Sequence, residues 1–136
     1  MPIIVGFVPT PEGHAALDRG IEEARLRGLR LVVLNTSRGD ALVDPRYASS
    51  GDWEAVRTKL ADSGIEHEVV QQVETRDPAD QLLRLARETN AEMIVIGMRP
   101  RTPVGKLILG SAAQTVLLSA DCPVLAVKAR RPSRFS

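Results

Sequence analysis

Residues 94–111 read IVIGMRPRTPVGKLILGS and contain the three elements that decide the fold: an apolar strand, a basic loop and the start of a helix. The strand runs into the loop, and the loop closes on Gly110 and Ser111. We predict that the Ser111 hydroxyl caps the helix, whose first backbone N–H groups point outward with the positive end of the helix dipole. A phosphate group fits such a helix start.

The loop also carries a local excess of positive charge. Arg99, Arg101 and Lys106 lie within it, and no acidic residue occurs between Glu92 and Asp121, although the whole chain has 18 basic and 17 acidic residues. Arginine side chains bind phosphate oxygens through charge-assisted hydrogen bonds. The pattern predicts an anion site, which differs from the phosphate loop of nucleoside triphosphatases because Lys106 is not followed by Ser or Thr.

Length and composition indicate one domain and exclude several functions. A chain of 136 residues with 43% hydrophobic residues can bury a core of its own, so we assign residues 1–129 to a single domain and residues 130–136 to a basic tail. A net charge of +1 provides no field that would attract DNA or an anionic membrane, and 3% aromatic residues provide little surface for base stacking. We expect no nucleic-acid partner.

The cysteine count and the absence of long apolar runs point to the cell interior. The single cysteine, Cys122, excludes an internal disulfide. The sequence shows neither a secretory signal nor an apolar run of the roughly 20 residues that a membrane span needs. We expect a cytoplasmic protein with no membrane partner.

Hydrophobic periodicity predicts strands that alternate with helices. Thr10 and Asp77, each followed by proline, are predicted helix starts, whereas Gly28 and Gly64 are predicted helix ends. Residues 36–51 are expected to form a long surface loop. The predicted strands cover residues 3–8, 29–35, 65–73, 93–96 and 124–127. Strict alternation predicts an α/β sandwich of three layers, with a parallel sheet and helices on both faces.

The spacing of glycines around the basic loop resembles the ATP-binding loop of universal stress proteins. Gly97 is followed by two residues, then a position that is usually glycine, then nine residues and Gly110-Ser111. The segments IIVGFVPTPEGHAAL, RDPADQLLRLARETNAEMIVIG and CPVLAVK also resemble that family, so the likeness covers roughly residues 3 to 128.

The resemblance implies a five-stranded sheet of order 3-2-1-4-5 and a ligand crevice beside the tip of the first strand. In such sheets a ligand binds at the strands' carboxyl ends, where the winding reverses. The family pattern then implies ATP or another adenine nucleotide as the ligand. The nucleotide-binding positions that it implies are Val8, Thr36, Gly97, Arg99, Gly110 and Ser111.

Two of the family's contact positions are altered in this chain. Val8 stands where nucleotide-binding relatives carry Asp, and Pro100 stands where they carry the second glycine. Proline has no N–H and a fixed φ, so it can neither donate to a phosphate nor adopt the glycine's backbone angles. Two lost contacts of about 1.5 to 3 kcal/mol each would weaken binding by about two to four powers of ten. Arg76 could also obstruct the nucleoside end.

Two functional hypotheses remain open at this point. The first is a dimeric stress-response module with an atypical, weak adenine-nucleotide crevice. The second is a dimeric interaction module that has lost the pocket, in which Gly97 serves a tight strand exit and Gly110-Ser111 caps a helix without a ligand. An ATP hydrolase is disfavoured because no general base and no carboxylate for magnesium are evident, so we expect no enzyme.

The last strand predicts a homodimer. Val124, Leu125, Ala126 and Val127 would form an exposed apolar edge with only Lys128 as a deterrent to pairing. Pairing with a symmetry mate would hide this edge, and the family resemblance implies such a dimer.

We find no catalytic or metal-binding candidates among the histidines and the cysteine. His14 and His67 are far apart in sequence and lack a Cys or Glu at a metal-ligand spacing, so both are expected to be surface residues. Cys122 precedes a predicted buried strand and has no base placed near it, so we expect an inert, apolar thiol.

Overall fold

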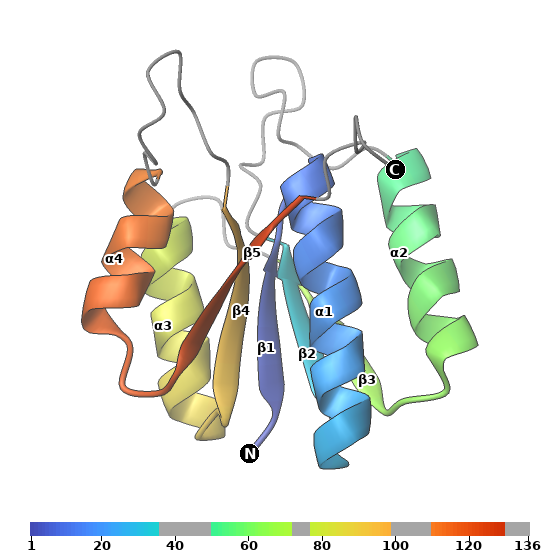
Figure 1. Cartoon of the computed structure of the whole chain (residues 1–136), viewed down its shortest axis with the longest axis horizontal. Coiled ribbons are helices and arrows are strands. Elements are labelled where there is room, and N and C mark those ends of the chain that lie inside the picture. Colours follow the sequence, from blue (N-terminus) through green and yellow to red (C-terminus); the bar gives the residue numbers. More distant parts are fainter. Residues whose placement is uncertain (36–49, 72–76, 99–109, 130–136) are drawn as a thin grey trace, which may run out of the picture.

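The computed structural model describes residues 1–35, 50–71, 77–98 and 110–129, and these residues form one parallel sheet with helices on both faces (Figure 1). The elements are β1 (Ile3–Phe7), α1 (Pro11–Arg27), β2 (Leu31–Asn35), α2 (Ser50–Ser63), β3 (His67–Val70), α3 (Pro78–Thr89), β4 (Met93–Met98), α4 (Ser111–Ser119) and β5 (Val124–Lys128).

The sheet has the order β3-β2-β1-β4-β5, and every neighbouring pair is parallel. In the register of the central strand, Ile3 lies opposite Leu31 of β2 and opposite Met93 of β4. The predicted fold class and strand order are therefore confirmed. β3 and β5 are the two edge strands of this sheet.

Two hydrophobic cores lie on the two faces of the sheet. Side chains alternate along β1, so that Val5 and Phe7 pack toward α1 and α2, whereas Ile4 packs toward α3 and α4. Figure 1 shows the same arrangement of helices, with one pair on each face. All residues of β1 and β2 are buried, as expected for the central strands of a parallel sheet.

The two strongest helix-start predictions are confirmed by their capping geometry. The Thr10 side chain accepts a hydrogen bond of 3.1 Å from the N–H of Gly13, and the Asp77 carboxylate accepts one of 3.2 Å from the N–H of Asp80. Gly28 ends α1 with φ 67°, in the left-handed region that glycine adopts without strain.

The predicted start of α2 and the predicted end of β3 are wrong. α2 already begins at Ser50, inside the predicted 36–51 loop. β3 ends at Val70 instead of Val73, because β2 itself ends one residue after the Leu34 that pairs with Val70. The predictions for residues 36–49, 72–76 and 130–136 lie outside the described residues.

The cap of α4 also differs from the prediction. Gly110, with φ −62° and ψ 155°, is the N-cap residue and forms no side-chain cap hydrogen bond, so Ser111 is the first residue inside the helix. An N-cap residue has extended backbone angles, which Ser111 loses by entering the helix.

Within the described ranges, no helix combines the length and apolar character that crossing a bilayer requires.

Candidate functional site

The carboxyl ends of β1 and β4 form the point at which the winding of the sheet reverses. The two strands are adjacent, with Gly6 opposite Ile96, and α1 leaves β1 on one face while α4 follows β4 on the other. Figure 1 shows the first turns of α1 and α4 at the same edge of the sheet as these strand ends. We call this place the switch point; in open α/β sheets it is where ligands bind.

Val8 follows the last residue of β1 and lies at the switch point, half-buried. Its carbonyl oxygen accepts a hydrogen bond of 2.8 Å from the N–H of Thr10, the N-cap residue of α1. A Cβ added at Gly13 would collide with the same carbonyl oxygen. The first turn of α1 is therefore packed directly onto the end of β1, and Val8 offers an apolar side chain there.

Gly97 lies in β4 beside this turn. A Cβ built at Gly97 would stand 2.6 Å from the carbonyl carbon of Glu12 and would collide with its carbonyl oxygen. No other residue type fits without a shift of the backbone. The glycine is thus required for the packing of α1 on β4, which is a different structural role from the strand exit that the sequence indicated.

Gly110 and the start of α4 form the opposite side of the switch point. Gly110 is exposed, and a Cβ at this position would meet no heavy atom within 4 Å. Its carbonyl accepts the N–H of Gln114 at 2.9 Å, and the first turn of α4 contains no acidic residue. The N–H groups of a first helical turn lack acceptors within the helix, so this end is electropositive.

The structure thus brings together three of the predicted site positions. Val8 and Gly97 lie at the ends of adjacent strands, and Gly110 begins the helix at the same edge. Thr36 and Arg99 lie outside the described residues, as does the side chain of Ser111.

A buried amide near this edge was missed by the sequence analysis. Asn35 ends β2 opposite Phe7 and is only 5% exposed. Its Nδ2 donates to the Oε1 of Gln71, 3.5 Å away, just after β3. The available signal was the polar residue that closes the apolar run LVVLN.

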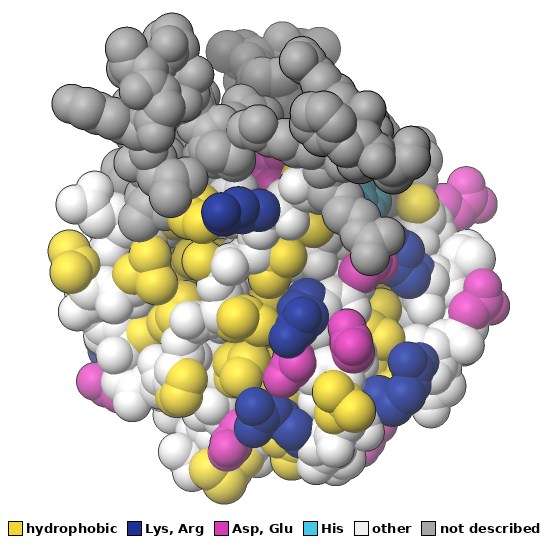
Figure 2. All heavy atoms as spheres, viewed as in Figure 1, with side chains coloured by type: hydrophobic (Ala, Val, Ile, Leu, Met, Phe, Trp, Pro, Cys, Tyr) yellow, Lys and Arg dark blue, Asp and Glu magenta, His cyan; other side chains and the backbone are white. Residues whose placement is uncertain are grey.

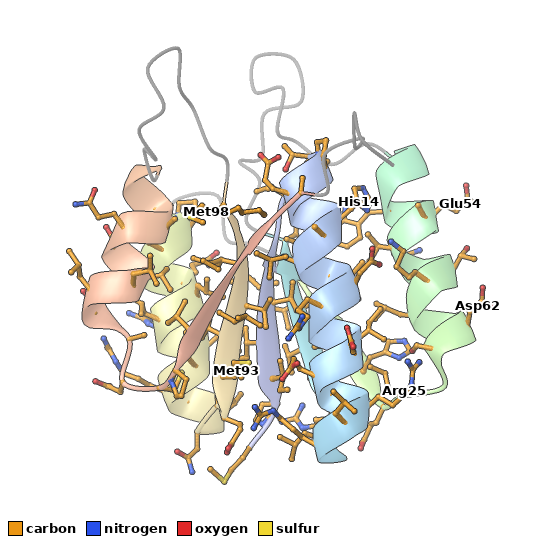
Figure 3. All side chains as sticks on the ribbon, in the orientation of Figure 1. His14, Arg25, Glu54, Asp62, Met93 and Met98 are labelled. Carbon is orange, nitrogen blue, oxygen red and sulfur yellow. The ribbon has the colours of Figure 1, made fainter. Side chains whose placement is uncertain are left out.

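The contact between His14 and Phe7, which lies opposite Asn35, differs from the expectation that His14 is a surface residue. His14 is half-buried, and its ring contacts Phe7 edge-on at 5.0 Å and 82°. Trp53 of α2 lies 5.8 Å from the Phe7 ring, and Figure 3 shows His14 between α1 and α2. His14 is therefore part of the helix packing, whereas His67 is exposed as predicted.

Clusters of metal ligands are not found in the part of the chain that the structure describes, where no three His, Cys, Asp or Glu side chains gather to hold an ion.

Comparisons with known proteins agree with this architecture. The model of the universal stress protein family matches residues 1–128. A universal stress protein of Mycolicibacterium smegmatis is 48% identical over 126 residues, which cover 93% of this chain and 96% of that protein.

Solved structures show the same fold. A universal stress protein from Archaeoglobus fulgidus superposes with a TM-score of 0.73 at 33% identity, covering 94% of this chain and 98% of the other. The structure of the universal stress protein from Archaeoglobus fulgidus in complex with dAMP gives a TM-score of 0.68 at 29% identity, with the same coverage. The sheet order, the switch point and the match over nearly the whole chain lead to one conclusion: this chain belongs to the universal stress protein family.

Proposed function

We propose that this chain is a cytoplasmic, homodimeric stress-response module that binds an adenine nucleotide weakly at the switch point and releases it unchanged. The observation that carries the proposal is the adjacency of β1 and β4, with the starts of α1 and α4 at the same edge. The dAMP complex of the Archaeoglobus fulgidus relative, which shares this fold, supports an adenine nucleotide as the ligand.

The start of α4 supplies the phosphate end of the proposed site. Gly110 leaves the approach to the helix open, and the first turn carries no acidic side chain that would repel an anion. By sequence, Arg99 and Ser111 add a guanidinium and a hydroxyl to this end. Binding of phosphate oxygens by such donors requires no catalytic base, so the proposal includes no turnover.

The alternative is a partner-binding module without a nucleotide. It is favoured by Val8, which places an apolar side chain at the tip of β1, and by Gly97, whose missing side chain is explained by contact with Glu12 alone. Neither residue offers a polar side chain to a ligand.

Calorimetric titration with ATP, ADP, AMP and cyclic AMP separates the two hypotheses. We expect dissociation constants on the order of 1 mM, further weakened in Arg99→Ala and Ser111→Ala. The double variant Val8→Asp, Pro100→Gly should bind ATP at least about tenfold more tightly, because it restores a polar contact and a flexible backbone position. Absence of heat at millimolar nucleotide supports the partner-binding alternative, and formation of ADP from ATP would contradict binding without turnover.

The homodimer is proposed to form through β5. β5 is an edge strand, and its apolar residues from Val124 to Val127 are each only half-buried although they contact both cores. On α4, Leu117 and Leu118 are 37% and 78% exposed. Figure 2 shows hydrophobic side chains gathered over the region of α4 and β5, whereas charged side chains alternate along α1. A second copy that pairs with β5 would cover this apolar edge.

A further inference from the structure

A hollow lies at the end of the molecule opposite the switch point. It has a volume of about 200 Å³ and lies where α3 and α4 end and the chain turns toward β4 and β5 (Figure 1). Its floor includes three apolar side chains, those of Leu83, Ala86 and Ala91, which are 5%, 7% and 8% exposed. The space is large enough for a short aliphatic chain.

Two helix C-termini face this hollow. Asn90 and Ala120, the C-cap residues of α3 and α4, both line it. The carboxyl end of a helix carries the negative end of its dipole and attracts cations within the last turn. Two such ends at one hollow make its surroundings electronegative.

Carboxylates add negative charge at the mouth. Asp121, whose side chain is 81% exposed, lines the hollow directly. Burial raises the pKa of the Cys122 thiol, and the negative charges of Asp121 and Glu92 raise it further. The thiol therefore stays neutral at physiological pH and adds an apolar surface to the hollow.

The chain places one cation of its own at this mouth. Of the described residues that line the hollow, Arg87 alone is positively charged, and its Nε lies 3.5 Å from the Asp121 carboxylate. The two side chains are 61% and 81% exposed. An ion pair this long and this exposed is weak, so another cation can replace the guanidinium.

We propose that this hollow binds a small organic cation, specifically a protonated aliphatic amine, with the ammonium group between Asp121 and the ends of α3 and α4 and the hydrocarbon chain on Leu83, Ala86 and Ala91. The site is independent of the proposed nucleotide site, since it lies beside the amino ends of β4 and β5 and shares no residue with that site.

Nuclear magnetic resonance titration with n-butylamine tests this proposal, with 1-butanol and butyrate as matched neutral and anionic probes. We expect amide shifts centred on Ala91 and Cys122 and a dissociation constant in the millimolar range. Asp121→Asn should weaken amine binding about two- to fivefold, the contribution of an exposed charge pair. Arg87→Met keeps the aliphatic stem but removes the competing charge, so it should strengthen binding of the amine and leave that of 1-butanol unchanged.

The charge dependence decides the outcome. The proposal is overturned if 1-butanol or butyrate binds as tightly as the amine, if Arg87→Met weakens amine binding, or if about 100 mM amine, far above the millimolar scale expected, causes no localised shift. Ala86→Leu, which fills the floor, should abolish the shifts. Glu88→Gln, an exposed substitution next to Arg87 and outside the lining, should leave them unchanged.

Discussion

Gly97 of β4 lies against the backbone of Glu12 in the first turn of α1, so closely that a methyl group at Gly97 would stand 2.6 Å from the Glu12 carbonyl carbon. Gly97→Ala should therefore lower the free energy of unfolding by about 1–3 kcal/mol, because a backbone segment rather than a flexible side chain must move. Urea denaturation followed by the fluorescence of Trp53, which packs near Phe7, measures the change.

Gly110→Ser is the matched control for this prediction. A Cβ at Gly110 meets open space, and serine is a preferred N-cap residue, so stability should stay equal or rise by a few tenths of a kcal/mol. If the two variants were equally stable, the tight contact between Gly97 and Glu12 would not limit the packing of α1.

Glu23 of α1 is a nearly buried carboxylate between two arginines. Its two oxygens lie 3.1 Å from the Nε of Arg19 and 3.3 Å from the Nε of Arg27, and its side chain is 10% exposed. Glu23→Gln leaves one acceptor oxygen for two guanidinium donors and should reduce stability by about 1 kcal/mol, a value kept small because both arginines are half-exposed. Thermal unfolding at low and high salt measures the loss, which should shrink with salt. The exposed neighbour Glu22 provides the control, since Glu22→Gln should change stability by less than about 0.5 kcal/mol.

The hydrogen bond from Ile94 N–H to the Pro123 carbonyl, 3.0 Å long, fixes which groups of β5 face β4. In a parallel ladder with this register, the N–H of Leu125 points to β4 and that of Ala126 points to the open edge. Ala126→Pro removes only the outward donor, so it should convert the proposed dimer to a monomer while the fold persists. Analytical ultracentrifugation at micromolar concentration measures the mass, and circular dichroism checks the fold. Ala126→Ser, which keeps the N–H, should remain dimeric; a folded, dimeric proline variant would rule out pairing through β5.

Cys122 should react slowly with thiol reagents. Burial raises the pKa of its thiol, and the Asp121 carboxylate raises it further, so less thiolate is present at pH 8 than in an unfolded peptide. We expect iodoacetamide to alkylate the folded protein several-fold more slowly than the urea-unfolded chain. The Asp121→Asn substitution should reduce the difference between these two alkylation rates.

The raised pKa of the Cys122 thiol also makes the stability of the fold depend on pH. Because the folded-state pKa lies above the unfolded one, the contribution of Cys122 to stability is complete below the unfolded pKa of about 8.5 and is lost as pH rises through the folded pKa. Cys122→Ala should remove this alkaline decline, and a decline of equal size in the variant would assign it to other groups.

The fold was predictable because its strongest signals are local. Thr10-Pro11 and Asp77-Pro78 specify helix starts through one side-chain acceptor and one fixed φ, and both caps form as predicted. The strand order followed from the family resemblance, which is carried by the spacing of Gly97 and Gly110-Ser111 and by residues 3–17, 76–97 and 122–128.

The site was less predictable because its geometry depends on contacts between distant residues. Gly97 was interpreted from its spacing to Gly110, yet the residue that a side chain at this position would meet is Glu12, 85 positions earlier (97 − 12). Asn35 and His14 lie beside the switch point through tertiary packing alone, which periodicity does not encode. Arg99 and Thr36 remain predictions.

The contacts that Gly13 and Gly97 allow make the α1 side of the switch point rigid. With no side chains between them, the backbone of α1 contacts the backbone at the ends of β1 and β4, and this close packing leaves no space for the elements to shift. We therefore expect the α4 side, where Gly110 has open space around it, to move when ligands of different size bind. Spectroscopic labels on α4 will respond to an occupant, and labels on α1 will stay silent.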